Sequence, residues 1–317
     1  MESRTTAASI ASSQPLLIPK WVTVRSASTR EADAAFAAGS ALATLDNLVR
    51  SEPPWAGCWR ARQALSSAVA SVKGMGRSED EIAIRDAVLL TLPGDDPGPA
   101  GKVFLAFQKF AARSGPITSE LLRELADLMG LKWDAALADV PGRVDELQES
   151  GRAAPFVVAQ VVRVVCVARA DAEVLAWGLA DRVLAQMLGW SHPMPMLMAE
   201  RSGVGFRTTG GRGRLRPADD GFDRAVCLAL VSGAGAALRR AGEIGRRAEQ
   251  LLAVAPKLRT KGADKVIRQL LDNDAVCVAR TDGDLSRWAS RRLFERVESL
   301  GAVRELSGRS QFKIYGL

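Results

Sequence analysis

The spacing of apolar residues changes within residues 263–317, and this change constrains the fold more than any other feature of the sequence. Up to Leu300 the apolar residues recur every three or four positions, which is typical of helices that bury one face. After Gly301 the period shortens to two in residues 303–306 and 311–315, which is typical of strands. The sequence therefore predicts a helix, a connector, a second helix and then a β-hairpin.

The second of these helices is basic. Its predicted N-cap is Ser286, because a serine oxygen can accept a hydrogen bond from the free amide groups of the first helical turn. Four apolar residues at spacings of three and four predict the buried face, namely Ala289, Leu293, Val297 and Leu300. Three polar residues and one aromatic residue fall on a different face, which we expect to be exposed, namely Arg287, Ser290, Arg291 and Phe294.

The predicted hairpin turns at residues 307–310, where a Ser-Gly pair separates the two alternating runs. Arg309 lies at this turn and Lys313 lies on the second strand. We expect both cationic side chains to be free to reach a phosphate group.

The connector, residues 272–285, departs from the pattern of a helix-turn-helix. Glycine and aspartate disfavour helix interiors, and the run Asp282-Gly283-Asp284 therefore leaves little room for the middle helix of that motif. Two interpretations remain open. Either the middle helix is a single turn, or the segment belongs to a modified wing domain that contacts protein.

This C-terminal layout resembles the winged-helix tail of bacterial regulators and the similar tail of Fic-type adenylyltransferases. The Fic catalytic motif is absent, so the resemblance implies no adenylylation. At the scale of the whole chain, four segments resemble an uncharacterised bacterial family of about this length: PPWAGCW (53–59), PGDDPGPAG (93–101), LLAVAPKLRTKGA (251–263) and RRLFERVESLGAVRELSGRSQFKIYGL (291–317). That resemblance implies one family along the chain and supplies no activity.

The residues before this tail predict a mainly α fold. Residues 1–27 begin with a Ser/Thr/Ala-rich stretch that lacks the apolar core of a signal peptide, and they predict a flexible tail. Residues 28–256 predict a multi-helix body, and residues 257–317 predict a small winged helix-turn-helix domain. Body helices are expected at 29–50, 55–73, 79–92, 102–113, 119–128, 133–140, 156–168, 171–188 and 223–252.

Charge is distributed unevenly along the chain. Residues 201–317 hold 23 Lys and Arg against 13 Asp and Glu, whereas the first 200 residues hold 20 against 23. A basic half is expected of a protein that binds a polyanion, although proteins from arginine-rich genomes share the pattern.

Few residues are available for cofactor or metal chemistry. His192 is the single histidine, and the four cysteines form no CxxC pair, so we predict no metal site, no cofactor and no disulfide framework. The most apolar run, residues 156–168, is interrupted by Gln160 and Arg163 and is too short to span a bilayer. These features indicate a cytoplasmic protein without a membrane segment.

The leading hypothesis is a DNA-binding bacterial regulator or accessory protein. The basic helix would enter the major groove of double-stranded DNA, where Arg287, Ser290 and Arg291 would meet bases or phosphates. Arg309 and Lys313 would hold the backbone, and the body would form a homodimer or sense a ligand. The alternative is a helical scaffold whose wing binds protein. An enzyme with a carboxylate site that leaves no motif is the third hypothesis.

Overall fold

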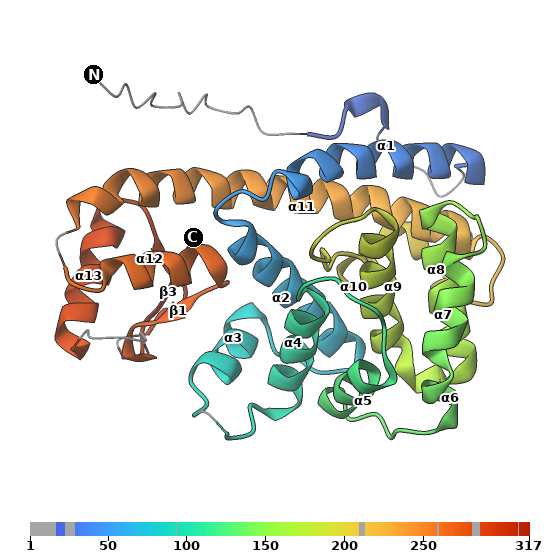
Figure 1. Cartoon of the computed structure of the whole chain (residues 1–317), viewed down its shortest axis with the longest axis horizontal. Coiled ribbons are helices and arrows are strands. Elements are labelled where there is room, and N and C mark those ends of the chain that lie inside the picture. The colour runs from blue at the N-terminus through green and yellow to red at the C-terminus, as the bar shows by residue number, and fades with distance from the viewer. Residues whose placement is uncertain are drawn as a thin grey trace, which may run out of the picture.

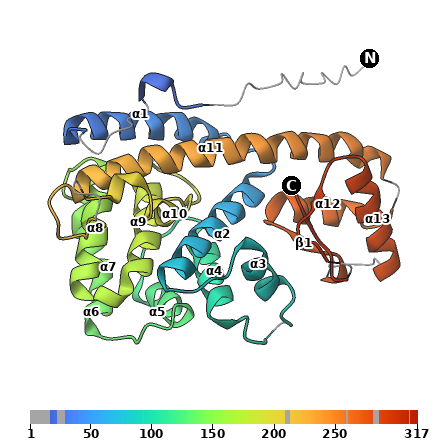
Figure 2. The ribbon, with the colours of Figure 1, turned by 180° about the vertical axis from the view of Figure 1, so that it is seen from behind.

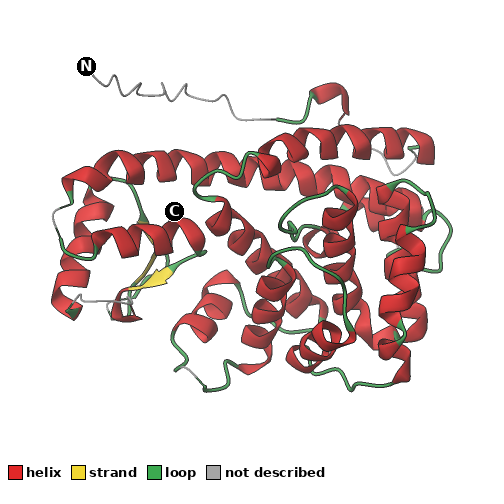
Figure 3. Cartoon of the chain, viewed as in Figure 1, coloured by secondary structure: helices red, strands yellow, loops and turns green. Residues whose placement is uncertain are grey.

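The computed structural model describes residues 17–22, 29–92, 94–208, 213–258, 260–280, 286–309 and 311–317. The chain is mainly helical, with a small three-stranded antiparallel sheet near the C-terminus (Figure 3). The predicted mainly α class is therefore confirmed. Most of the predicted N-terminal tail lies outside the described residues, but residues 17–22 are described and Val22 is buried.

The sequence patterns located most of the body helices. Their bounds are α1 (Glu31–Arg50), α2 (Ala56–Gly74), α3 (Glu81–Leu89), α4 (Gly98–Phe110), α5 (Ser119–Leu128), α6 (Ala135–Ala138), α7 (Val140–Gln148), α8 (Ala154–Ala168), α9 (Glu173–Met187), α10 (Leu197–Glu200) and α11 (Phe222–Val254). Two local signals differ from expectation. The helix expected at 79–92 begins at Glu81, and its N-cap is Asp80, which accepts a 2.9 Å hydrogen bond from the Ala83 amide. The helix that begins at Val140 was not expected, and Pro141 stands in its first turn, where proline is tolerated.

Helix α11 organises the molecule. It is 33 residues long and runs along one side, with α1 packed beside it and the other body helices beneath (Figures 1 and 2). The buried face of α11 contains alanines and glycines, whose small size allows α1 and the other helices to pack closely against it. By length and composition residues 222–257 are apolar enough to cross a membrane, but 61% of the apolar window is buried inside the protein. Packing against α1, α2 and α8 accounts for that composition.

Residues 263–317, hereafter the C-terminal unit, contain two helices and the sheet. Their bounds are α12 (Ala263–Asp272), β1 (Val276–Cys277), the 3-10 turn η5 (Val278–Arg280), α13 (Arg287–Ser299), β2 (Arg304–Glu305) and β3 (Ile314–Gly316). The strands lie in the order β1-β3-β2, with Val276 opposite Tyr315 and Arg304 opposite Gly316. The two predicted hairpin strands are present but shorter than expected, and β1 was not predicted. Residues 281–285 lie outside the described part.

The C-terminal unit shares the hydrophobic core of the body. Leu270, Phe294 and Tyr315 belong to the same continuous buried cluster as α2 and α11. A smaller cluster, made of Ala275, Cys277 and Ile314 with Leu89 and Leu90 at the end of α3, covers the other side of the sheet. The unit is thus packed on the body through both of these apolar contacts.

Candidate nucleic-acid interface

Helix α13 lies at the outer end of the molecule, with α12 and the sheet between it and the body (Figures 1 and 2). Ser286 caps it as predicted, since its Oγ accepts a 3.2 Å hydrogen bond from the Ala289 amide. Gly301 follows in the left-handed conformation, with φ of 71°, and this ends the helix. These local signals set the two ends of α13.

The buried face of α13 is wider than predicted, because Leu293 and Val297 are buried as expected but two residues of the face expected to be exposed are buried too. Ser290 is fully buried, and its Oγ donates a 3.1 Å hydrogen bond to the Val278 carbonyl oxygen. Phe294 is buried as well and stacks on Tyr315 of β3, with ring centroids 5.0 Å apart. The expectation that Ser290 meets DNA is therefore wrong. The Ser290 hydroxyl can be buried beneath the helix because the Val278 carbonyl oxygen of η5 accepts its hydrogen bond.

The exposed face of α13 carries three cationic side chains, Arg291, Arg292 and Arg296. Trp288 is 66% exposed, and the Arg292 guanidinium lies over its ring at 4.6 Å from the centroid. Nε of Arg291 donates a 2.8 Å hydrogen bond to Oε1 of Glu295. Arg287 begins the helix, but its side chain is outside the described residues. This face therefore combines arginines with one exposed aromatic ring.

The hairpin side chains are less free than the sequence suggested. Arg309 donates a hydrogen bond to Oδ2 of Asp86 on α3, so its guanidinium contacts the body. Lys313 is half-buried and lines a pocket of about 270 Å³ together with Phe312, Tyr315 and Arg291. We expected both side chains to be free to hold a DNA backbone. This is wrong for Arg309, because its guanidinium is already paired with the Asp86 carboxylate of the body.

A buried cluster of charges joins the C-terminal unit to the body, and no sequence motif indicated it. Asp274 accepts hydrogen bonds from Nε of Arg62 on α2 and, at 2.6 Å, from Nε of Arg85 on α3. Nη2 of Arg62 also donates to the Asp274 carbonyl oxygen at 2.9 Å and to the Leu317 carbonyl oxygen at 3.3 Å. Burial by itself raises the pKa of Asp274, but the two guanidinium groups outweigh burial and lower it below its ordinary value.

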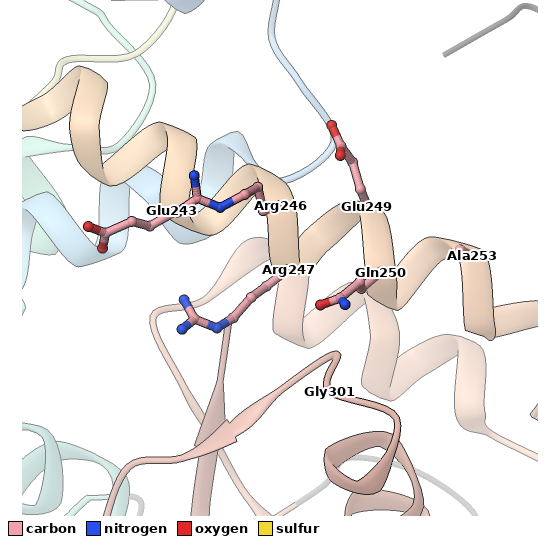
Figure 4. A pocket seen from close by; sticks show the side chains of 7 residues that line it. All are labelled: Glu243, Arg246, Arg247, Glu249, Gln250, Ala253 and Gly301. Carbon is pink, nitrogen blue, oxygen red and sulfur yellow. The ribbon is translucent and has the colours of Figure 1, made fainter. Parts of the chain in front are cut away.

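A second cleft lies where the end of α11 faces the connection after α13. It measures about 820 Å³ and is lined by Glu243, Arg246, Arg247, Glu249, Gln250, Ala253 and Gly301. Figure 4 shows Arg247 and Gln250 on the side of α11 that faces Gly301, while Glu249 points away from it. Two glutamates balance the two arginines, so the formal charge of the lining favours neither anions nor cations.

Comparison with protein families covers nearly the whole chain, body and C-terminal unit together. A single family model matches residues 6–317. The chain belongs to the family described as "Protein of unknown function (DUF1403)". The resemblance of four separate segments to one uncharacterised family is thereby confirmed. No curated protein is significantly similar to the chain. Membership of this family carries no activity, so function must be argued from the site.

Proposed function

We propose that the C-terminal unit is a winged-helix-like module and that α13 binds double-stranded DNA. The order helix, strand, helix, strand, strand and the sheet order β1-β3-β2 support the winged-helix interpretation. The observation that carries the DNA proposal is the exposure of Arg291, Arg292 and Arg296 on α13. This helix lies at the outer end of the molecule (Figure 1). Cationic side chains on an exposed helix provide phosphate contacts and base contacts in the major groove.

The proposed binding mode differs from the sequence-based one in its use of the hairpin. Arg309 holds the hairpin to Asp86 of the body, so α13 makes the DNA contacts while the hairpin fixes its orientation. Arg292 is already held against the Trp288 ring, which reduces the rotamer freedom that binding would remove. Arg291 and Lys313, which line the same pocket, stand at the edge of this surface.

The test measures binding of the full chain to a labelled random-sequence duplex over a series of salt concentrations. Each phosphate contact contributes about 0.9 to the slope of log affinity against log salt, so Arg292→Ala/Arg296→Ala should flatten the slope by about two units. The matched control is Lys132→Ala/Arg143→Ala, which removes two exposed cations, one between α5 and α6 and one on α7. These helices lie far from α13 (Figure 1). The control should bind as the wild type does.

Two results would contradict the proposal. The first is a wild-type chain that does not bind duplex even at low salt. The second is an equal loss in the α13 variant and in the control, because this would indicate only a general effect of net charge.

One observation favours a second candidate, a module that binds protein. Trp288 and Phe312 are both exposed by more than half, and Phe312 lines the 270 Å³ pocket beside α13. Exposed aromatic residues beside a pocket are typical of protein interfaces. If Trp288→Ala/Phe312→Ala abolishes self-association in ultracentrifugation while DNA binding is absent in the wild type, this candidate replaces the first.

A further inference from the structure

A third pocket lies on the body, at the point where the body meets the end of α12. It measures about 320 Å³, and its polar lining consists of Arg60, Gln108, Arg113, His192, Asp272 and Asn273. These residues come from α2, from the end of α4, from the loop before α10 and from the end of α12. We call it the anion pocket.

The two arginines of the anion pocket have no direct partner within the described residues. Neither the Arg60 nor the Arg113 guanidinium donates a hydrogen bond or forms an ion pair there, whereas the buried Arg62 and Arg85 are both paired with Asp274. Arg60 is partly buried, and desolvation lowers its pKa. Unused donors on the partly buried Arg60 guanidinium are costly unless a ligand or water satisfies them, whereas Arg113 is exposed to solvent.

The carboxylates nearby do not satisfy these arginines. Glu52, just after α1, is held by the Ser191 hydroxyl, which donates to its carboxylate. Asp272 is exposed at the rim of the anion pocket. Its charge attracts Arg60, but it forms no direct ion pair within the described part of the chain. With His192 neutral, the lining of the anion pocket has a formal charge of +1, in contrast to the balanced cleft on α11.

We propose that the anion pocket binds a small oxyanion, the phosphate or carboxylate group of a small molecule. Arg60 and Arg113 would donate charge-assisted hydrogen bonds to its oxygens, with Gln108 and His192 able to donate as well. The volume accommodates the anionic group together with a small organic remainder. The occupant is a small molecule because the lining comes from four separate segments that form a pocket and not an extended groove.

The position of the anion pocket couples it to the C-terminal unit. Gly57 of α2 lies against the backbone of Asp272, so close that an added Cβ would stand 2.7 Å from the Asp272 Cα. A ligand in the pocket would touch both α2 and the end of α12, and would stabilise the docked position of the unit by mass action. Through this coupling, the position of the proposed DNA-binding module on the body would depend on whether the ligand is bound. Binding of the oxyanion itself does not depend on the DNA proposal.

His192 provides a direct readout, because it is the single histidine of the chain. Its pKa lies below the ordinary value because of desolvation first and then Arg60 and Arg113, while Glu52 opposes the shift. A bound oxyanion adds negative charge beside the ring and so favours the imidazolium. We therefore expect titration with inorganic phosphate, at ionic strength matched with sodium chloride, to shift the His192 ring resonances saturably and to raise the His192 pKa.

The variants Arg60→Gln and Arg113→Gln test the named residues, with Arg143→Gln as the control on α7. Each pocket variant should weaken phosphate binding by about tenfold or more, the loss expected for one charge-assisted hydrogen bond. Acetate is titrated separately, and a saturable shift with either anion supports the proposal. Both variants should fold, because neither side chain makes a hydrogen bond within the described residues, and circular dichroism checks this.

Two results would overturn the proposal. One is a His192 spectrum that neither anion changes beyond the effect of chloride. The other is an identical phosphate shift in the wild type and in Arg60→Gln/Arg113→Gln, which would indicate non-specific ion binding. DNA is absent from the experiment, so its outcome does not depend on the proposed DNA-binding function.

Discussion

Arg85 and Asp274 are separated by 189 residues in the sequence, yet Nε of Arg85 donates a 2.6 Å hydrogen bond to Oδ2 of Asp274. Arg62 donates to the other carboxylate oxygen, so one acidic side chain of the C-terminal unit binds α2 and α3 together. All three side chains are more than nine-tenths buried. Removing charges from water is costly, and only mutual attraction with well-formed hydrogen bonds offsets that cost. The position of the unit on the body therefore depends on this cluster.

We expect Asp274→Asn to destabilise the chain by about 3–5 kcal/mol, because it leaves the buried Arg62 guanidinium without a paired carboxylate and leaves Arg85 with only the longer 3.9 Å contact to Glu81. Urea unfolding followed by circular dichroism measures the change. Asp264→Asn on the exposed side of α12 is the control and should change stability by less than about 0.5 kcal/mol. A loss below about 1 kcal/mol for Asp274→Asn would show that the cluster does not hold the unit in place.

The same cluster predicts an acid-sensitive contribution to stability. Burial raises the pKa of Asp274, but Arg62 and Arg85 outweigh it and hold the pKa below 3.8, the ordinary value. A carboxylate with a lowered folded-state pKa stabilises the fold above its unfolded pKa and loses that effect as the pH falls through the folded value. The stability advantage of the wild type over Asp274→Asn should thus be constant near neutral pH and decrease below about pH 4. A difference that stays constant down to about pH 2 would contradict this assignment.

Arg309→Ala tests whether the hairpin is held to the body through Asp86 or instead contacts a DNA phosphate. The side chain is 46% exposed, so loss of its ion pair with Asp86 should cost about 1 kcal/mol or less. Amide exchange should become faster in residues 304–316, while the salt slope of DNA binding should remain unchanged. If Arg309 instead contacts a phosphate, the slope would decrease by about one unit, and the anchoring role would be wrong.

Gly57→Ala tests the contact between α2 and α12. The added Cβ would stand 2.7 Å from the Asp272 Cα and 2.8 Å from its carbonyl oxygen, so one helix has to move. We expect a loss of about 1–3 kcal/mol, as for other overpacked sites. Gly39→Ala on α1 is the control, because nothing lies within 4 Å of its added Cβ. That change should stabilise by about 0.5–1 kcal/mol, since alanine is the better helix former. Equal effects at both glycines would show that the contact is loose.

The sequence by itself determined the local elements. A Ser286 cap, the helical spacing after it and Gly301 placed α13 to within one residue of its observed end, and the change to a period of two located the hairpin. These signals act between residues within about four positions of each other, so they can be predicted from the sequence without knowledge of the rest of the fold. The mainly α class follows from the same local patterns.

Only the tertiary structure decided which side chains are available for binding. Ser290 and Arg309 looked exposed in the sequence, but one lies beneath α13 against η5 and the other is paired with Asp86. Likewise, Arg60, Arg113 and His192 lie far apart in the sequence and share no motif, yet they line one pocket. The reason is physical. Burial and ion pairing depend on which elements dock together, and docking is set by long-range packing that local spacing does not record.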